Sequence, residues 1–292
     1  MAEVVVALKG GLGNQIFEYA AGMSLSRRLG VLLCLDVSAY EDPRERHFAL
    51  APFELPEPVV KRDLHRWGRG SLVDRIYRRL ARQLGLQRCG LPVFSERSYG
   101  YDQRFELVRN AVLLDGYFQS PRYFHDIADE VRARFADPRA LSVASQQMLD
   151  LIRSTDAICV HVRRGDYVTN PAANRVHGLC EMSYYTEGLA IAGEGLLAPH
   201  CFIFSNDADW VRENMHLQYP VTVVDINGED AAHEDLWLMS ACRSFVIANS
   251  SLSWWGAWLG RHPAKRVVAP LQWFKGLEMD TSSLIPADWI RI

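Results

Sequence analysis

The chain has 292 residues, of which 49% are hydrophobic and 23% are charged, and its formal net charge is -3. This composition excludes disordered and collagen-like proteins, and the length is enough to bury one large core or two smaller ones. A slightly acidic chain has no global basic field, so we expect no nucleic-acid partner.

No apolar run reaches the roughly 18 residues of a membrane-spanning helix, and the first residues lack the charged-then-apolar layout of a signal peptide. We therefore expect a cytoplasmic protein. The six cysteines show no CxxC spacing, so we expect reduced, buried thiols rather than a metal or redox site.

The N-terminal segment predicts a β-α-β unit. Residues 4–8 form an apolar run, an amphipathic helix is expected from about 14 to 29, and a second apolar run covers 31–35. Strands that are apolar at nearly every position are typical of a parallel sheet covered on both faces. Prolines interrupt residues 40–101, which we expect to form an irregular insertion before a strand at 112–114 and a helix at 122–135.

The second half of the chain alternates regularly between strands and helices. We expect strands at 157–162, 201–204, 221–224, 245–248 and 266–269, with helices at 183–192, 208–215, 233–241 and 251–259. This alternation predicts a doubly wound sheet. The expected fold class is α/β, with two Rossmann-like doubly wound domains that face each other across a cleft, residues 1–145 and 146–292.

A glycine-rich loop joins the first strand to the first helix. Gly11, Gly13 and Asn14 would offer backbone N–H groups and a helix dipole to an anion or polar ligand. The loop also partly fits a dinucleotide fingerprint, since Asp36 ends the second strand, but Ile16 replaces the third glycine. A nicotinamide-dependent oxidoreductase and a purely structural turn therefore stay open as alternatives.

A cluster of charged residues follows the first strand of the second half, where His161, Arg163, Arg164 and Asp166 lie close together. The carboxyl end of a strand in an open α/β sheet faces the ligand crevice. Guanidinium groups bind phosphate oxygens through bidentate, charge-assisted hydrogen bonds, so this cluster predicts a site for a diphosphate. A structural ion pair between Asp166 and one arginine is the alternative.

Two further polar groups follow later strands. Asp207 and Asp209 have the form of a metal-binding pair, but Asp209 also lies where a carboxylate complements a helix dipole, and we expect no metal. Asn249, Ser250 and Ser251 open a helix, either as helix caps or as ligands for a phosphate. The tryptophans that follow them are expected to fill the core.

These blocks, in this order, resemble the α-1,2-fucosyltransferases of glycosyltransferase family 11. The matching stretches are residues 10–20, 161–166, 204–207, 235–240 and 249–259, and the resemblance covers about residues 5–274. Ile16, Glu18 and Leu252 depart slightly from the usual pattern, and residues 40–100 match no pattern of the family.

The resemblance implies a GT-B-like fold, with GDP-fucose held mainly by the C-terminal half. It also implies transfer with inversion, without a required metal or other cofactor, to the 2-hydroxyl of a galactose-containing oligosaccharide or lipid-linked glycan. By comparison with other fucosyltransferases, Arg163 would contact the diphosphate, His161 and Asp207 the guanine or its ribose, and Ser250 and Ser251 the phosphates. Asn14 would lie near the transferred sugar or the acceptor.

An acceptor hydroxyl also needs a base, for which Asp166 is the first candidate and His177 the second. Another nucleotide-sugar transferase and a non-catalytic nucleotide-binding protein remain alternatives to the fucosyltransferase. Residues 61–88 carry nine Lys or Arg against two acids. They predict a basic helix at about 71–84 with a cationic outer face, either solvated or resting on anionic membrane lipid.

Overall fold

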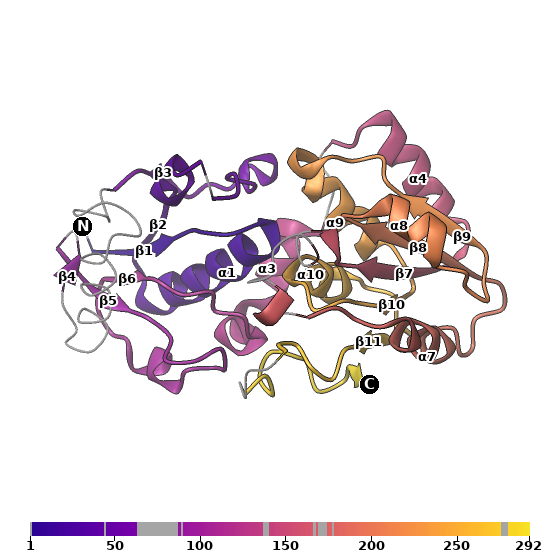
Figure 1. Cartoon of the computed structure of the whole chain (residues 1–292). Coiled ribbons are helices and arrows are strands. Elements are labelled where there is room, and N and C mark those ends of the chain that lie inside the picture. Colours follow the sequence, from indigo (N-terminus) through magenta and orange to yellow (C-terminus); the bar gives the residue numbers. More distant parts are fainter. Residues whose placement is uncertain are drawn as a thin grey trace. The chain divides into compact units, whose positions relative to one another are not determined.

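The computed structural model describes residues 2–43, 45–62, 87–88, 90–136, 140–165, 168, 174–176, 178–275 and 280–292. The chain divides into two compact units. Unit 1 contains Met1–Val131 together with Asp280–Leu284, and unit 2 contains Arg132–Met279 together with Ile285–Ile292. Each unit is built on its own sheet (Figure 1), and each sheet has six strands.

Unit 1 has a mainly parallel sheet with one antiparallel edge. In sheet order its strands are β3 (Val59–Val60), β2 (Leu32–Asp36), β1 (Glu3–Ala7), β6 (Val112–Leu114), β5 (Leu91–Phe94) and β4 (Gln87–Arg88). Among the described strand pairs of this sheet, β4–β5 alone is antiparallel. β1 is central, and Val4, Val5 and Val6 are completely buried. The apolar run that predicted this strand is thereby explained.

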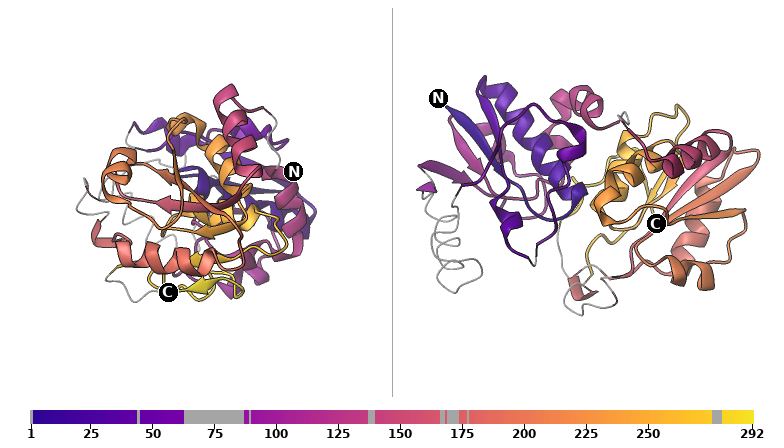
Figure 2. Two further views of the ribbon diagram at one scale, coloured as in Figure 1. Left: turned by 90° about the vertical axis from the view of Figure 1, so that its right-hand side faces the viewer. Right: turned by 90° about the horizontal axis from the view of Figure 1, so that it is seen from above.

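Helix α1 (Leu12–Leu29) packs along β1 and β2 (Figure 2). It begins after Gly11, whose backbone is extended, and no side chain caps its first turn. Arg27 and Arg28 lie in its last turn, where positive charge is favourable beside the helix dipole. The β-α-β unit predicted from the sequence is therefore present.

The stretch expected to be an irregular insertion instead contributes strands to the sheet of unit 1. β3 pairs in parallel with β2, and β5 pairs in parallel with β6. These strands are short and carry few buried side chains, so their apolar signal is weak. The predicted basic helix at 71–84 lies outside the described residues.

Unit 2 contains a parallel sheet with helices on both faces. In sheet order its strands are β12 (Ile290–Arg291), β11 (Val267–Ala269), β10 (Ser244–Val246), β7 (Asp156–Val162), β8 (Pro199–Ser205) and β9 (Val221–Val224). Its helices include α4 (Val143–Arg153), α7 (Met182–Ala192), α8 (Ala208–Asn214), α9 (Ala232–Ser240) and α10 (Ser251–Leu259), and α3 (Ala128–Phe135) spans the border of the two units. α4 and α9 cover one face of the sheet and α7 the other (Figure 1). The α/β fold predicted for this half is confirmed.

Two elements of unit 2 were not predicted. α4 occupies a stretch expected to separate the domains, and Ser142 caps it by accepting a hydrogen bond from Ser145 N at 3.2 Å. β12 contains only two residues. Among the described cysteines, all are free thiols: Cys34, Cys159, Cys201 and Cys242 are buried, and Cys180 is partly buried.

Candidate functional site

The sheet of unit 2 has a point where its strand order reverses. From β7 the chain proceeds outward through β8 to β9, and then returns to β10 on the other side of β7 before moving outward through β11 to β12. In open parallel sheets, ligands bind outside the carboxyl ends of the strands at such a reversal. The carboxyl ends of β7 and β10 carry residues 161–165 and 249–251, which are two of the clusters found in the sequence.

His161 is the penultimate residue of β7 and is only 4% exposed. Its Nδ1 is buried and has no hydrogen-bond partner among the described residues. Burial, with a smaller contribution from the charge of Arg163, lowers the pKa of His161 to about 3. The imidazole is therefore neutral near pH 7, which leaves one ring nitrogen able to accept a hydrogen bond.

The turn after β7 is fixed by the end of the neighbouring strand. Asn206 follows β8, and its Oδ1 accepts hydrogen bonds from the backbone N–H groups of Arg164 at 2.9 Å and Gly165 at 3.2 Å. Asn206 was part of a matching stretch but had no predicted role. Its role is to fix the backbone from which the two arginine side chains project.

The two arginines have different surroundings. The Nε of Arg164 lies 3.4 Å from Asp207 Oδ2, and its guanidinium lies 4.2 Å from the centre of the Trp210 ring. Asp207 also caps α8 by accepting a hydrogen bond from Trp210 N at 3.4 Å. Arg164 is thus held against Asp207 and Trp210, whereas Arg163 is a half-buried residue one position closer to β7.

The start of α10 lacks a side-chain cap. Ser250 is the N-cap residue with extended backbone angles, but its hydroxyl makes no capping hydrogen bond. The Ser253 hydroxyl instead donates to Ser250 O at 3.2 Å, and Asn249 Nδ2 donates to Trp273 O at 3.2 Å. The capping alternative for Ser250 is therefore not realised. The core role expected for the tryptophans is confirmed, since Trp254, Trp255 and Trp258 are buried.

Asp207 and Asp209 do not form a shared ligand pair. The side chain of Asp209 is 92% exposed and its Oδ1 lies 3.1 Å from Arg212 Nη1, whereas Asp207 faces Arg164 and the first turn of α8. Across the described part of the chain, no group of three or more His, Cys, Asp or Glu residues is placed to hold a metal ion.

At the centre of the sheet of unit 1, β1 and β6 are parallel neighbours, so their carboxyl ends lie side by side. The glycine-rich loop follows β1 and residues 115–119 follow β6. Gln119 Nε2 donates to Asn14 Oδ1 at 2.8 Å, which joins the two segments. A side chain at Gly11 would meet no atom within 4 Å, so the described fold does not require a glycine there. Close approach of a ligand remains the predicted reason for this residue.

Charged residues that the sequence reasoning missed lie beneath the glycine-rich loop. Lys9 Nζ lies 2.9 Å from Asp115 Oδ1, and the backbone N–H of Lys9 donates to Glu18 Oε2 at 2.9 Å. Burial raises the pKa of Glu18 well above its usual range, although Lys9 opposes the shift. The only sequence signal was a lysine next to the glycines and an acid on the buried face of the following helix.

Asp36, the acid of the dinucleotide alternative, is already occupied by the protein. It is 1% exposed, and its carboxylate accepts hydrogen bonds from the backbone N–H groups of Ser38 at 2.9 Å and Arg62 at 3.0 Å. A carboxylate held in this way has a structural role. The alternative of a nicotinamide-dependent oxidoreductase therefore loses its ribose-binding residue.

The comparisons with known proteins identify the family. The model of Glycosyl transferase family 11 matches residues 99–292. The chain belongs to glycosyltransferase family 11. An α-1,2-colitosyltransferase of Escherichia coli is 30% identical over all of this chain and 99% of its own length. The O-antigen biosynthesis glycosyltransferase WbnK of the same species is 31% identical over 98% of this chain and 99% of its own.

A more distant family 11 relative is the mouse galactoside α-(1,2)-fucosyltransferase 2, with 26% identity over 86% of this chain and 66% of its own. Among solved structures, the fold resembles that of a mutant of Arabidopsis thaliana FUT1 in complex with GDP, with a TM-score of 0.52 and 11% identity over 91% of this chain and 70% of that one. The NodZ α-1,6-fucosyltransferase co-crystallised with GDP gives a TM-score of 0.50 with 16% identity over 87% of this chain and 91% of that one. The GT-B-like fold class is thereby confirmed.

Two predicted site residues, Asp166 and His177, lie outside the described residues, as does most of the basic segment 61–88. Arg163, Arg164, His161 and Asp207 lie together at the ends of β7 and β8, and residues 249–251 follow the neighbouring strand β10. Gly11, Gly13 and Asn14 belong to unit 1. Within the residues that the structure describes, no helix has the length and apolar character needed to cross a membrane.

Proposed function

We propose that this family 11 glycosyltransferase transfers L-fucose from GDP-β-L-fucose, with inversion, to the 2-hydroxyl of a galactosyl residue in a glycan. The observation that carries the proposal is the grouping of polar residues at the β7–β10 reversal. A neutral imidazole, two arginines and an uncapped helix start lie there at the carboxyl ends of adjacent strands. Such a cluster of residues is suited to binding a nucleoside diphosphate.

Arg163 is the residue proposed to stabilise the leaving group. Departure of GDP from an oxocarbenium-like sugar places negative charge on the β-phosphate oxygens, and a fixed cation nearby lowers the barrier. The Asn206 hydrogen bonds hold the backbone at residues 164 and 165, so Arg163 projects from a rigid turn. A preorganised guanidinium loses little freedom as the charge develops.

The remaining donor contacts follow from the same edge of the sheet. Asp207, oriented by Arg164, would accept hydrogen bonds from the guanine or ribose, and the free nitrogen of His161 would lie nearby. The N–H groups at the start of α10, with the hydroxyls of Ser250 and Ser251, would bind phosphate oxygens. Arginine side chains that neutralise the diphosphate in place of a metal ion support a reaction that needs no metal.

The acceptor side is proposed to involve Gly11, Gly13 and Asn14 of unit 1, next to the transferred sugar or the acceptor. Asp166 remains the first candidate for the base and His177 the second. The acceptor is proposed to be a galactose-containing oligosaccharide or a lipid-linked glycan, and one E. coli relative is named for O-antigen biosynthesis. A cytoplasmic enzyme, with residues 61–88 on the inner membrane surface, would meet such a glycan during its assembly.

A second donor has a specific observation in its favour, which is the 30% identity with an α-1,2-colitosyltransferase over the whole chain. Colitose is fucose without its 3-hydroxyl. A site that hydrogen-bonds this hydroxyl discriminates strongly against the sugar that lacks it, because its polar groups are then left unpaired. The two donors are therefore distinguishable by rate.

The test is a donor panel of GDP-fucose, GDP-colitose, GDP-mannose and UDP-galactose, each with and without lactose. We expect GDP release from GDP-fucose that lactose stimulates. In the product, the anomeric proton coupling should show the α configuration, and a long-range proton–carbon correlation across the glycosidic bond should place the linkage at the 2-position. Faster release from GDP-colitose would assign the second donor instead. Release of nucleotide from UDP-galactose or GDP-mannose, but from neither GDP-fucose nor GDP-colitose, would refute both donor assignments.

A further inference from the structure

The segment after β6 adopts an unusual backbone conformation. Phe118 has a φ of 50°, which is uncommon for a residue with a side chain. Its ring is completely buried and packs against the rings of Phe94, Phe105 and Tyr123, with centroids 6.3, 6.2 and 5.2 Å away. Other parts of unit 1 must therefore stabilise this conformation, since the isolated chain disfavours it.

Glu96 binds the segment directly. Its Oε2 accepts hydrogen bonds from the backbone N–H groups of Tyr117 at 2.9 Å and Phe118 at 2.8 Å. A Cβ atom on Gly116 would lie 2.7 Å from the same oxygen, so only glycine lets the chain pass this close to the carboxylate. One side chain thus fixes two successive amides.

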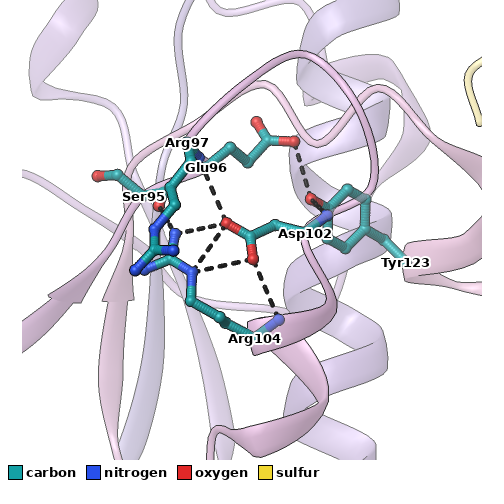
Figure 3. A network of polar contacts seen from close by, with 6 residues as sticks. All are labelled: Ser95, Glu96, Arg97, Asp102, Arg104 and Tyr123. Carbon is teal, nitrogen blue, oxygen red and sulfur yellow. Dashed lines mark hydrogen bonds and ion pairs between the residues drawn. The ribbon is translucent and has the colours of Figure 1, made fainter. Parts of the chain in front are cut away.

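Glu96 is itself held in a network that Figure 3 shows. Its Oε1 accepts a hydrogen bond from the Tyr123 hydroxyl at 3.0 Å, and that hydroxyl accepts one from Asp102 N at 2.9 Å. Asp102 is bound in turn by the guanidinium of Arg104, with Nε 3.0 Å from Oδ1. Burial raises the pKa of Glu96, while its three hydrogen bonds and Lys9 oppose the shift.

The fixed segment ends at Gln119, whose side chain reaches Asn14. Gln119 Nε2 donates to Asn14 Oδ1 at 2.8 Å, across 105 positions of the chain. The Asn14 amide lies against Gly10, where a Cβ atom would come within 2.6 Å of Nδ2 and where φ is 71°. Gln119 on one side and Gly10 on the other therefore define how the Asn14 amide is turned.

We propose that Glu96 is a positioning residue that acts through Gln119 on Asn14. By fixing the amides of residues 117 and 118, it places Gln119 so that Asn14 Oδ1 is occupied and its Nδ2 donors are available to a sugar hydroxyl. This inference rests on the proposed function only in taking Asn14 as a residue that contacts a sugar. Glu96 touches no ligand in this mechanism and differs in that respect from the catalytic residues.

The kinetic test is a double-mutant cycle of Glu96→Gln with Asn14→Ala. Glu96→Gln keeps the shape of the side chain, and we expect kcat to fall about 10-fold while the Kd for GDP is unchanged, because misplacement of a contact by a fraction of an ångström weakens catalysis more than binding. If Glu96 acts through Asn14, adding Glu96→Gln to Asn14→Ala has little further effect. The proposal would be overturned if the two substitutions lowered kcat independently, so that their effects multiplied in the double variant.

The matched control is Glu106→Gln, which removes an exposed carboxylate of unit 1 that binds Arg28 and Tyr101 but not residues 116–119. We expect its kcat to equal that of the wild type. Glu96→Asp keeps the charge but shortens the reach of the side chain, and its kcat should lie between those of the wild type and Glu96→Gln. It replaces Glu96→Gln as the test variant if Glu96→Gln folds poorly.

A second readout does not depend on activity. In protein labelled with ¹⁵N-asparagine, the side-chain NH₂ signals of Asn14 are assigned by their loss in Asn14→Asp. They should shift in Glu96→Gln and in Gln119→Ala and stay in place in Glu106→Gln. Unmoved signals in Glu96→Gln would refute the inference. A wild type inactive with every donor would refute the proposed function alone, since these spectra would still decide the role of Glu96.

Discussion

Replacing Arg163 by alanine tests the proposed chemistry most directly. A hydrogen bond to a charged group contributes about 1.5–3 kcal/mol, and the upper part of that range applies where a guanidinium meets developing charge. Since about 1.4 kcal/mol corresponds to a tenfold change in rate, the expected loss in kcat is on the order of 100-fold. The Asn206 hydrogen bonds involve the backbone of residues 164 and 165, so they survive the substitution and the turn keeps its shape.

The assay is steady-state GDP release from GDP-fucose with lactose, accompanied by thermal unfolding to verify the fold. Arg163→Lys should recover little, because an ammonium cannot reproduce the two parallel hydrogen bonds of a guanidinium. Arg164→Ala is the matched comparison: its partners Asp207 and Trp210 predict a larger effect on the KM for the donor than on kcat. Near-normal kcat in Arg163→Ala would refute the assignment of this residue to the leaving group.

Turnover is expected to persist in excess EDTA, and Asp209→Asn should be much milder than Asp207→Asn because Asp209 is exposed and pairs with Arg212. Loss of activity on chelation and recovery with Mn²⁺ would refute arginine-based phosphate binding. Gly11→Ala should leave the unfolding temperature unchanged, since the added Cβ meets no atom within 4 Å. If a ligand approaches the backbone at residue 11, activity assays should show that the same substitution lowers kcat/KM at least 10-fold. Burial raises the pKa of Asp235 to about 7, so the folded state holds a proton that the unfolded state releases near pH 4. The free energy of unfolding therefore falls as the pH rises between these values, by about 1.4 kcal/mol per unit of pKa difference. Asp235→Asn should remove this loss, so that the variant melts at a higher temperature than the wild type at pH 8 but not below pH 4. If residues 61–88 bind anionic lipid, co-sedimentation with anionic liposomes should fall when four arginines are changed to glutamate, namely Arg75, Arg78, Arg79 and Arg82. Equal, salt-insensitive partitioning of the two proteins would favour a solvated face.

The long buried strands were predictable because their local sequence carries the whole signal. β7 and β8 each contain a continuous buried apolar run, residues 157–160 and 201–204, and each is followed by a polar motif of the candidate site. α4 was missed because few of its side chains are buried and it follows a stretch that suggested a boundary. β3 and β12 have two residues each, so the sheet itself, rather than their own sequence, determines their conformation.

The candidate site was predictable where residues adjacent in sequence act together, as at residues 161–165 and 249–251. It was not predictable where a contact joins distant segments. Glu96 binds amides 21 and 22 positions away, and nothing in its neighbourhood distinguishes it from a surface acid. The surroundings of Arg164 likewise depend on Trp210, which lies in α8, after α7 and β8 in the chain.

The discontinuity of unit 1 has a consequence for how the protein is made. Ser283 lies near the end of the chain, yet its hydroxyl accepts from Tyr101 N at 2.7 Å and its carbonyl accepts from the Ser120 hydroxyl at 2.5 Å. During synthesis, the first unit therefore emerges from the ribosome early but acquires these bonds only when the last residues follow. A chimera that exchanges halves between two relatives should accordingly carry residues 280–284 with the first half, because unit 1 otherwise lacks these hydrogen bonds.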